Sequence, residues 1–137
     1  MPNKTPSNNI LENLDLVIEN LNEGVIIINL SGKILKVNRT LLEIGHYKRS
    51  DLEGKNAMKL VKIFPLKSLK KIIASFTHAA KGYSADRYRV EAKTKEGNKR
   101  IIELSTSLIE KNNKAIGIAV VVRDVTMILE YRKFNKK

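Results

Sequence analysis

The chain has 137 residues, of which 42% are hydrophobic and 29% charged, which is typical of one globular domain with a single core and excludes a disordered chain. The absence of cysteine excludes disulfides, thiolate metal sites and cysteine nucleophiles. The net charge of +12 could attract nucleic acid, anionic lipid or an acidic protein partner.

The amino-terminal segment and the longest apolar run indicate where in the cell the protein is expected. Residues 1–8 are polar and contain two prolines, so we expect a disordered tail and no signal peptide. The longest apolar run, residues 115–122, is far shorter than the roughly 20 residues that a membrane-spanning helix needs. We therefore expect no membrane span and a cytoplasmic protein.

A first helix is predicted over residues 9–22, where Asn9 followed by Glu12 fits an amino-terminal cap. Its apolar residues recur at alternating spacings of four and three, as in a heptad seam. This seam consists of Ile10, Leu14, Val17 and Leu21. The helix either packs on its own domain or also meets a second subunit, and the pattern leaves both open.

Two strands are expected next, Gly24 to Asn29 and Lys33 to Val37, joined by a turn that contains Gly32. Asn38 should end the second strand and cap a short helix, with Gly45 as its left-handed terminator. Brief helical turns should follow.

A longer helix is predicted from Pro65 to Gly82, because proline is tolerated in a first turn and glycine ends helices. The stripe expected to face inward is Leu66, Leu69, Ile73, Phe76 and Ala80. The densest basic run lacks aromatic residues at stacking intervals, so we expect a solvated surface, with a nucleic-acid site as the alternative. This run comprises Lys55, Lys59, Lys62, Lys67, Lys70 and Lys71.

Three more strands close the domain, and the last, Ile116 to Val122, is apolar on both faces, as is the stretch Val25 to Ile28. Both should therefore occupy central positions that are covered from both sides. The short hairpins make the sheet antiparallel. The predicted fold is α+β, a five-stranded antiparallel sheet with short helices and one longer helix on one face and the amino-terminal helix on the other.

Four pieces follow one another along the chain: EGVIIINLSGKILKVN, GHYKRSDLEGKN, the hairpin KEGNKR and the closing VVRDVT. Their letters and their order resemble the PAS sensory domain family over Leu14 to Thr126. Asn29, His46 and Val125 depart mildly from the family pattern. On this resemblance, one PAS-like domain spans residues 9–126, and residues 127–137 begin a carboxyl-terminal linker helix.

The resemblance implies a sensory module, not an enzyme, and no catalytic arrangement surrounds Asp124. We expect an apolar cavity to bind a small ligand or answer a partner, and Asp124 and Thr126 to pass the change to terminal helices that both rest on the outer face of the sheet. The candidate cavity residues are Met58, Val61, Leu69, Ile73, Phe76, Tyr88, Val90 and Leu104.

The expected partners are a second copy of the chain and a downstream signalling protein, of the histidine kinase type in the family. The cofactor stays unknown. Ala57 stands where flavin-binding light sensors have their reactive cysteine, which excludes a flavin–cysteine adduct. His46 and His78 are expected on the surface, which disfavours haem, and no metal site is expected. The alternatives are a basic nucleic-acid-associated regulatory module and a ligand-free dimerisation module.

Overall fold

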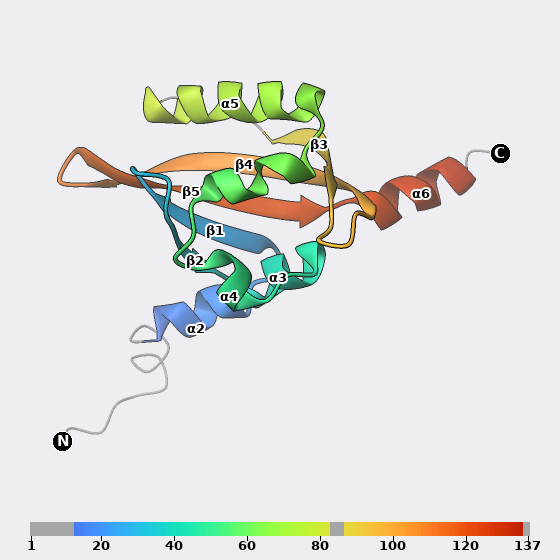
Figure 1. Cartoon of the computed structure of the whole chain (residues 1–137), viewed down its shortest axis with the longest axis horizontal. Coiled ribbons are helices and arrows are strands. Elements are labelled where there is room, and N and C mark those ends of the chain that lie inside the picture. The colour runs from blue at the N-terminus through green and yellow to red at the C-terminus, as the bar shows by residue number, and fades with distance from the viewer. Residues whose placement is uncertain (1–12, 83–86, 136–137) are drawn as a thin grey trace, which may run out of the picture.

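The computed structural model describes residues 13–82 and 87–135 and is built on one five-stranded antiparallel sheet (Figure 1). The strand order is β2-β1-β5-β4-β3, and neighbouring strands run antiparallel throughout. The predicted α+β architecture is therefore confirmed. The strands are β1 (Gly24–Asn29), β2 (Ile34–Val37), β3 (Tyr88–Lys93), β4 (Lys99–Lys111) and β5 (Lys114–Asp124).

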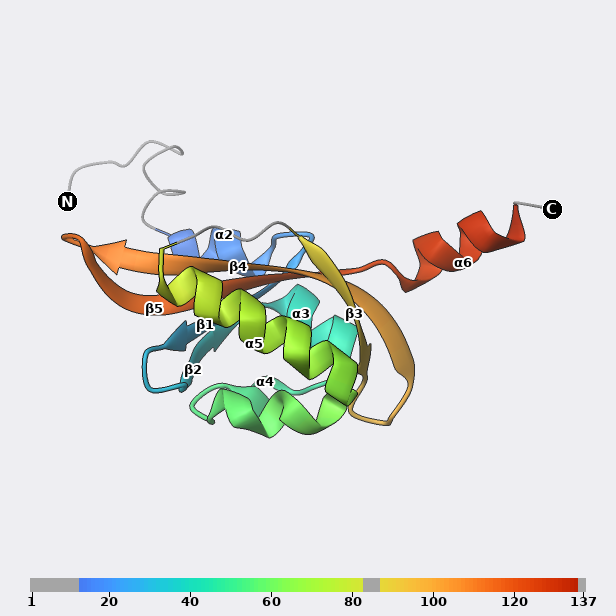
Figure 2. The same cartoon turned by 90° about the horizontal axis from the view of Figure 1, so that it is seen from above.

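The helices lie on both sides of this sheet, with α5 and α2 on opposite sides in both views (Figures 1 and 2). The short α3 and α4 and the 3-10 helix η1 follow one another between β2 and α5. The helices are α2 (Leu14–Glu19), α3 (Arg39–Gly45), α4 (Arg49–Leu52), η1 (Ala57–Ile63), α5 (Leu66–Ala80) and α6 (Thr126–Phe134).

The two strands predicted to be central are central: β5 lies in the middle of the sheet with β1 beside it. Ile26 and Ile28 of β1 belong to the main core, together with Val120 and Val122 of β5. On the opposite face of β1, Val25 is only 7% exposed. Apolar residues on both faces of a strand thus reflect cover on both sides.

Asn38 joins three elements at the end of β2. Its side chain is fully buried, and its Oδ1 accepts hydrogen bonds from the backbone N–H groups of Val25 (2.9 Å) and Leu41 (3.1 Å). Its Nδ2 donates to the carbonyl oxygens of Ile18 and Glu23, both at 2.9 Å. One amide thereby caps α3, as predicted, and also holds β1 and the end of α2.

Two predicted helix ends are wrong in detail. The left-handed residue after α3 is His46, with φ of 59°, and not Gly45. Gly45 is required for another reason, since a Cβ there would lie 2.7 Å from the ring of Tyr47. The helix predicted over 9–22 is described from Leu14 and ends at Glu19, where the Asn20 side chain bonds back to the Leu16 carbonyl. Residues 9–12, including Ile10, and the predicted tail lie outside the described residues.

The face of α5 that packs on the sheet differs from the predicted stripe. Ser68, Ser75 and Ala79 are the buried residues of α5, and Ser68 Oγ donates to the Glu91 carbonyl (2.9 Å). Small side chains bring the helix axis close to the strands. The predicted stripe lies beside this contact: Leu69 and Phe76 are half-buried and Phe76 packs against the core, whereas Leu66 is 69% and Ile73 64% exposed.

The prediction that α6 rests on the outer face of the sheet is wrong. The helix projects away from the domain (Figures 1 and 2). Its apolar side chains Met127, Tyr131 and Phe134 are 77%, 71% and 75% exposed. Nothing within the described part of the chain covers them.

Candidate functional site

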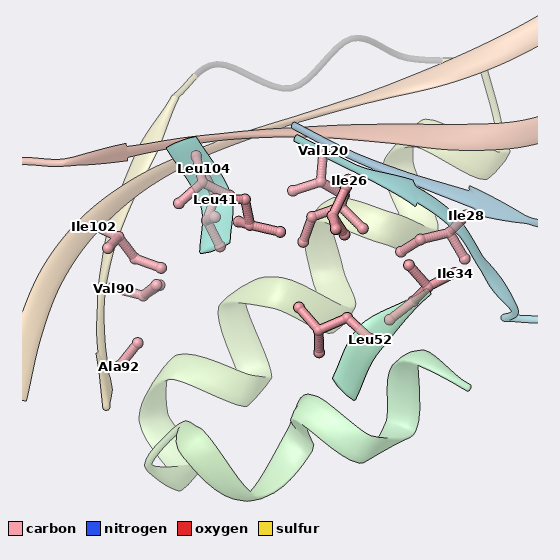
Figure 3. Close-up of a cluster of buried hydrophobic side chains, with 12 residues drawn as sticks. Ile26, Ile28, Ile34, Leu41, Leu52, Val90, Ala92, Ile102, Leu104 and Val120 are labelled. Atoms are coloured by element: carbon pink, nitrogen blue, oxygen red, sulfur yellow. The ribbon is translucent and has the colours of Figure 1, made fainter. Parts of the chain in front are cut away.

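An apolar cavity of about 680 Å³ lies between the inner face of the sheet and the helices that follow β2. Its size is in the range of small-molecule sites, about 300–1,000 Å³. In Figure 3, Leu41 and Leu52 of the helices lie on the same side of the sheet as the labelled strand residues. The strands contribute Ile26, Ile28, Ala92, Ile102, Leu104, Ile118, Val120 and Val122 to its wall.

Six of the eight predicted cavity residues line this space. They come from η1, α5 and β4: Met58, Val61, Leu69, Ile73, Phe76 and Leu104. Tyr88 and Val90 do not line it, because both pack into the core beside β4, where Val90 is 4% exposed. The Tyr88 hydroxyl is buried, as are those of Ser75 and Thr106, and none of the three has a hydrogen-bond partner among the described residues.

The cavity opens to solvent between η1 and α5. Met58 of η1 and Ile73 of α5 both line it, and yet they are 70% and 64% exposed. On α5 the small residues contact the strands, and the larger Leu69, Ile73 and Phe76 beside them line the cavity. A small molecule could therefore enter without unfolding the domain.

The sequence prediction missed two cations on the cavity wall, Lys93 and Arg100. Arg100 pairs with Ala92 across the sheet, which places it on the same inner face. Its Nε lies 3.6 Å from Oδ2 of Asp124. Strand alternation could have placed Arg100 on the inner face, because it stands two and four residues before Ile102 and Leu104. Its charge argued against this, because charged side chains favour solvent.

Asp124 and Thr126 form a hydrogen-bonded junction between the sheet and α6. Asp124 Oδ1 accepts from the backbone N–H of Thr126 (2.9 Å) and from its hydroxyl (2.6 Å). The Ile101 N–H donates to Thr126 Oγ1 (2.8 Å), and the Val125 N–H donates to the Ile101 carbonyl (2.9 Å). The first turn of α6 is thus bonded to β4, one residue from Arg100.

Neither histidine lines the cavity. His46 is exposed and its Nδ1 lies 2.6 Å from Glu96 Oε1, a contact that lowers the pKa of the Glu96 carboxyl. His78 is an exposed residue of α5. These positions do not fit an axial haem ligand, which must point into the pocket. Among residues 13–82 and 87–135 no group of three acidic or histidine side chains could hold a metal ion.

The basic run predicted to be solvated is solvated. All six of its lysines, between Lys55 and Lys71, are exposed. Lys67 pairs with Glu91 (3.9 Å), and Lys59 donates to the Asp51 carbonyl (3.1 Å). Within the described ranges, no helix is long and apolar enough to cross a membrane.

Comparisons with known proteins agree with this architecture. The PAS domain family model matches residues 22–127. A PAS domain from Colwellia psychrerythraea has a TM-score of 0.70 at 17% identity, and the match covers 86% of this chain and 98% of that one. A PAS domain from a two-component sensor histidine kinase has a TM-score of 0.64 at 15% identity, with 86% and 98% covered.

An RNA-binding Light-Oxygen-Voltage receptor is also similar, with a TM-score of 0.74 at 13% identity, and the match covers 95% of this chain and 37% of that one. At such identities the structural likeness shows the fold. A search of curated proteins found no match. The family model nevertheless spans most of the chain, and the protein therefore belongs to the PAS domain family.

Proposed function

We propose that the protein is a sensory module in which a small apolar molecule occupies the cavity and α6 passes the response to a signalling partner. PAS domains are typically sensory modules without catalytic activity. The observation that carries the proposal is the open apolar cavity of about 680 Å³, because a core of this size normally fills such a space with side chains.

The route from cavity to partner runs through the junction at the end of β5. Arg100 lines the cavity and pairs with Asp124, which in turn accepts two hydrogen bonds from Thr126, the first residue of α6. A ligand that moves Arg100 changes the contacts of Asp124. Such a switch needs two arrangements that differ by only a few kcal/mol, which is the scale of these partly exposed contacts.

The exposed apolar surface supports a second part of the proposal, a homodimer. Leu14, Val17 and Leu21 remain exposed on and beside α2 at heptad spacing, by 57%, 39% and 43%. A packed helix would normally bury such a seam. In this arrangement α2 meets the same helix of a second copy, and α6 contacts the downstream partner, which we propose is of the histidine kinase type.

Hydrogen exchange with decanol as the probe tests the proposed route. Decanol binding should change the exchange of the Leu129 amide, which donates to the Val125 carbonyl in the first turn of α6. Thr126→Val removes the hydroxyl bonds to Ile101 and Asp124, and should abolish this change while decanol still binds.

The matched control is Thr40→Val, which removes the hydroxyl bond to the Leu21 carbonyl but none of the bonds of the Asp124–Thr126 junction, and should leave the response of Leu129 intact. Saturable binding without any exchange change between residues 125 and 129 would refute the route. Absence of decanol binding would refute the proposal that a small apolar molecule occupies the cavity.

A further inference from the structure

We propose that the ligand is an anionic amphiphile, an apolar chain that ends in a carboxylate held by Arg100. This inference rests on the proposed apolar cavity and adds the chemical class of its occupant.

The first argument is the charge of the cavity wall. Among the described residues, its lining includes two cations, Lys93 and Arg100, and no aspartate or glutamate. The rest is almost entirely apolar, apart from the amides of Asn29 and Asn56, the hydroxyl of Thr77 and the phenol of Tyr47, whose pKa is raised by burial. An apolar site with cations alone is complementary to a molecule with an apolar body and a negative end.

The second argument is the state of the two cations. Arg100 has one ion pair in the described part of the chain, the 3.6 Å contact of its Nε with Asp124. The other edge of its guanidinium can therefore hold a carboxylate in the bidentate geometry that arginine favours. Lys93 follows Ala92 on β3, so the alternation of the strand turns its side chain to the opposite face, and Arg100 is the cation that can meet the charged end of the ligand.

The third argument concerns the response. A ligand carboxylate at Arg100 would share the guanidinium with Asp124, whose Oδ1 holds Thr126 at the start of α6. The charged end of the ligand would thus act on the residue pair that leads out of the domain. A neutral ligand of the same length could displace Arg100 only by its bulk, whereas a carboxylate would also compete with Asp124 for the guanidinium.

Calorimetric titration of the full chain with octanoate, decanoate and dodecanoate, and with decanol and decylammonium, tests the proposal at physiological salt. Affinity should rise about fourfold per added methylene, because each buried methylene contributes about 0.8 kcal/mol. Decanoate should bind more tightly than decanol, and decylammonium most weakly.

Arg100→Gln should weaken decanoate binding about tenfold and leave decanol binding unchanged. The matched control is Lys111→Gln, which removes one positive charge from the exposed end of β4, at a residue that does not line the cavity, and should change neither. Should Arg100→Gln fail to fold, Arg100→Lys provides the same comparison with a smaller expected loss, because lysine keeps the charge but not the bidentate geometry.

The outcomes separate the two proposals. Equal affinity for decanol and decanoate, unaltered by Arg100→Gln, would overturn the anionic head group and leave the apolar cavity standing. An equal loss of decanoate affinity in Lys111→Gln would show attraction to the overall charge and would also overturn the inference. Failure of every probe to bind would overturn the proposed function itself.

Discussion

At the scale of single residues, Asn38 shows how a buried polar group can specify a fold. Both oxygen and nitrogen of its amide are used, and its two donated bonds reach backbone carbonyls of the segment that leads from α2 into β1. Only an amide can accept from two N–H groups and donate to two carbonyls at once. Its burial is therefore stabilising because every polar atom is satisfied.

We predict that Asn38→Asp lowers the free energy of unfolding by about 3 kcal/mol, since a carboxylate cannot donate to the Ile18 and Glu23 carbonyls and would face both. Urea unfolding followed by circular dichroism measures this. Asn22→Asp makes the same chemical change at an exposed position and should cost less than about 0.5 kcal/mol. Equal effects of the two substitutions would contradict this role.

The cavity residues show what alternation and helical periodicity can and cannot predict. The regular alternation of β4 predicts Leu104 on the inner face, and this prediction is confirmed. Arg100 shares that face, but its charge predicts a surface position. Ile73 was expected to line the cavity and does, yet it is 64% exposed because it stands at the opening. Residue type predicts a preference for burial, whereas the position of an opening depends on how two elements pack.

At the scale of elements, α2 is attached to the domain mainly by polar contacts, and its apolar seam stays exposed to solvent. Glu19 pairs with Arg49 of α4, and this bond from the guanidinium lowers the pKa of the Glu19 carboxyl. Thr40 donates to the Leu21 carbonyl (2.6 Å), which fixes the end of the segment. Since these contacts do not bury Leu14 or Val17, the seam is available to a second helix.

We predict that the double substitution Leu14→Glu and Leu21→Glu converts a dimer of the chain into a monomer, because it places like charges where two seams would meet. Light scattering of the purified protein measures the mass. Leu30→Glu changes an equally exposed leucine in the β1–β2 turn and should leave the dimer intact. A dimer that survives the double substitution would exclude α2 as its seat.

Sequence reasoning predicted the sheet better than the helices. Strands β1 and β5 were placed centrally because apolar residues on both faces require cover on both faces. The orientation of α5 was not predicted, since Ser68 and Ser75 are too polar to be chosen as a buried face. Their small size decides the packing instead. The direction of α6 depends on the junction at Asp124 and Thr126, whose geometry no periodicity encodes.

At the scale of the whole molecule, the domain has an apolar space inside and apolar surface outside. The inner space lies between the sheet and α5, and the outer surface includes α2 and α6. Both could attract an apolar probe, so binding alone does not locate the site. The account requires the probe to enter the space inside.

Nuclear Overhauser effects between decanol and methyl-labelled protein test this most directly. The account predicts contacts from the decanol chain to the methyl groups of Leu69, Leu104 and Ile118, which line the cavity. Contacts confined to Leu14 and Val17 of α2 or Ile128 of α6 would place the probe on the outer surface and contradict the account.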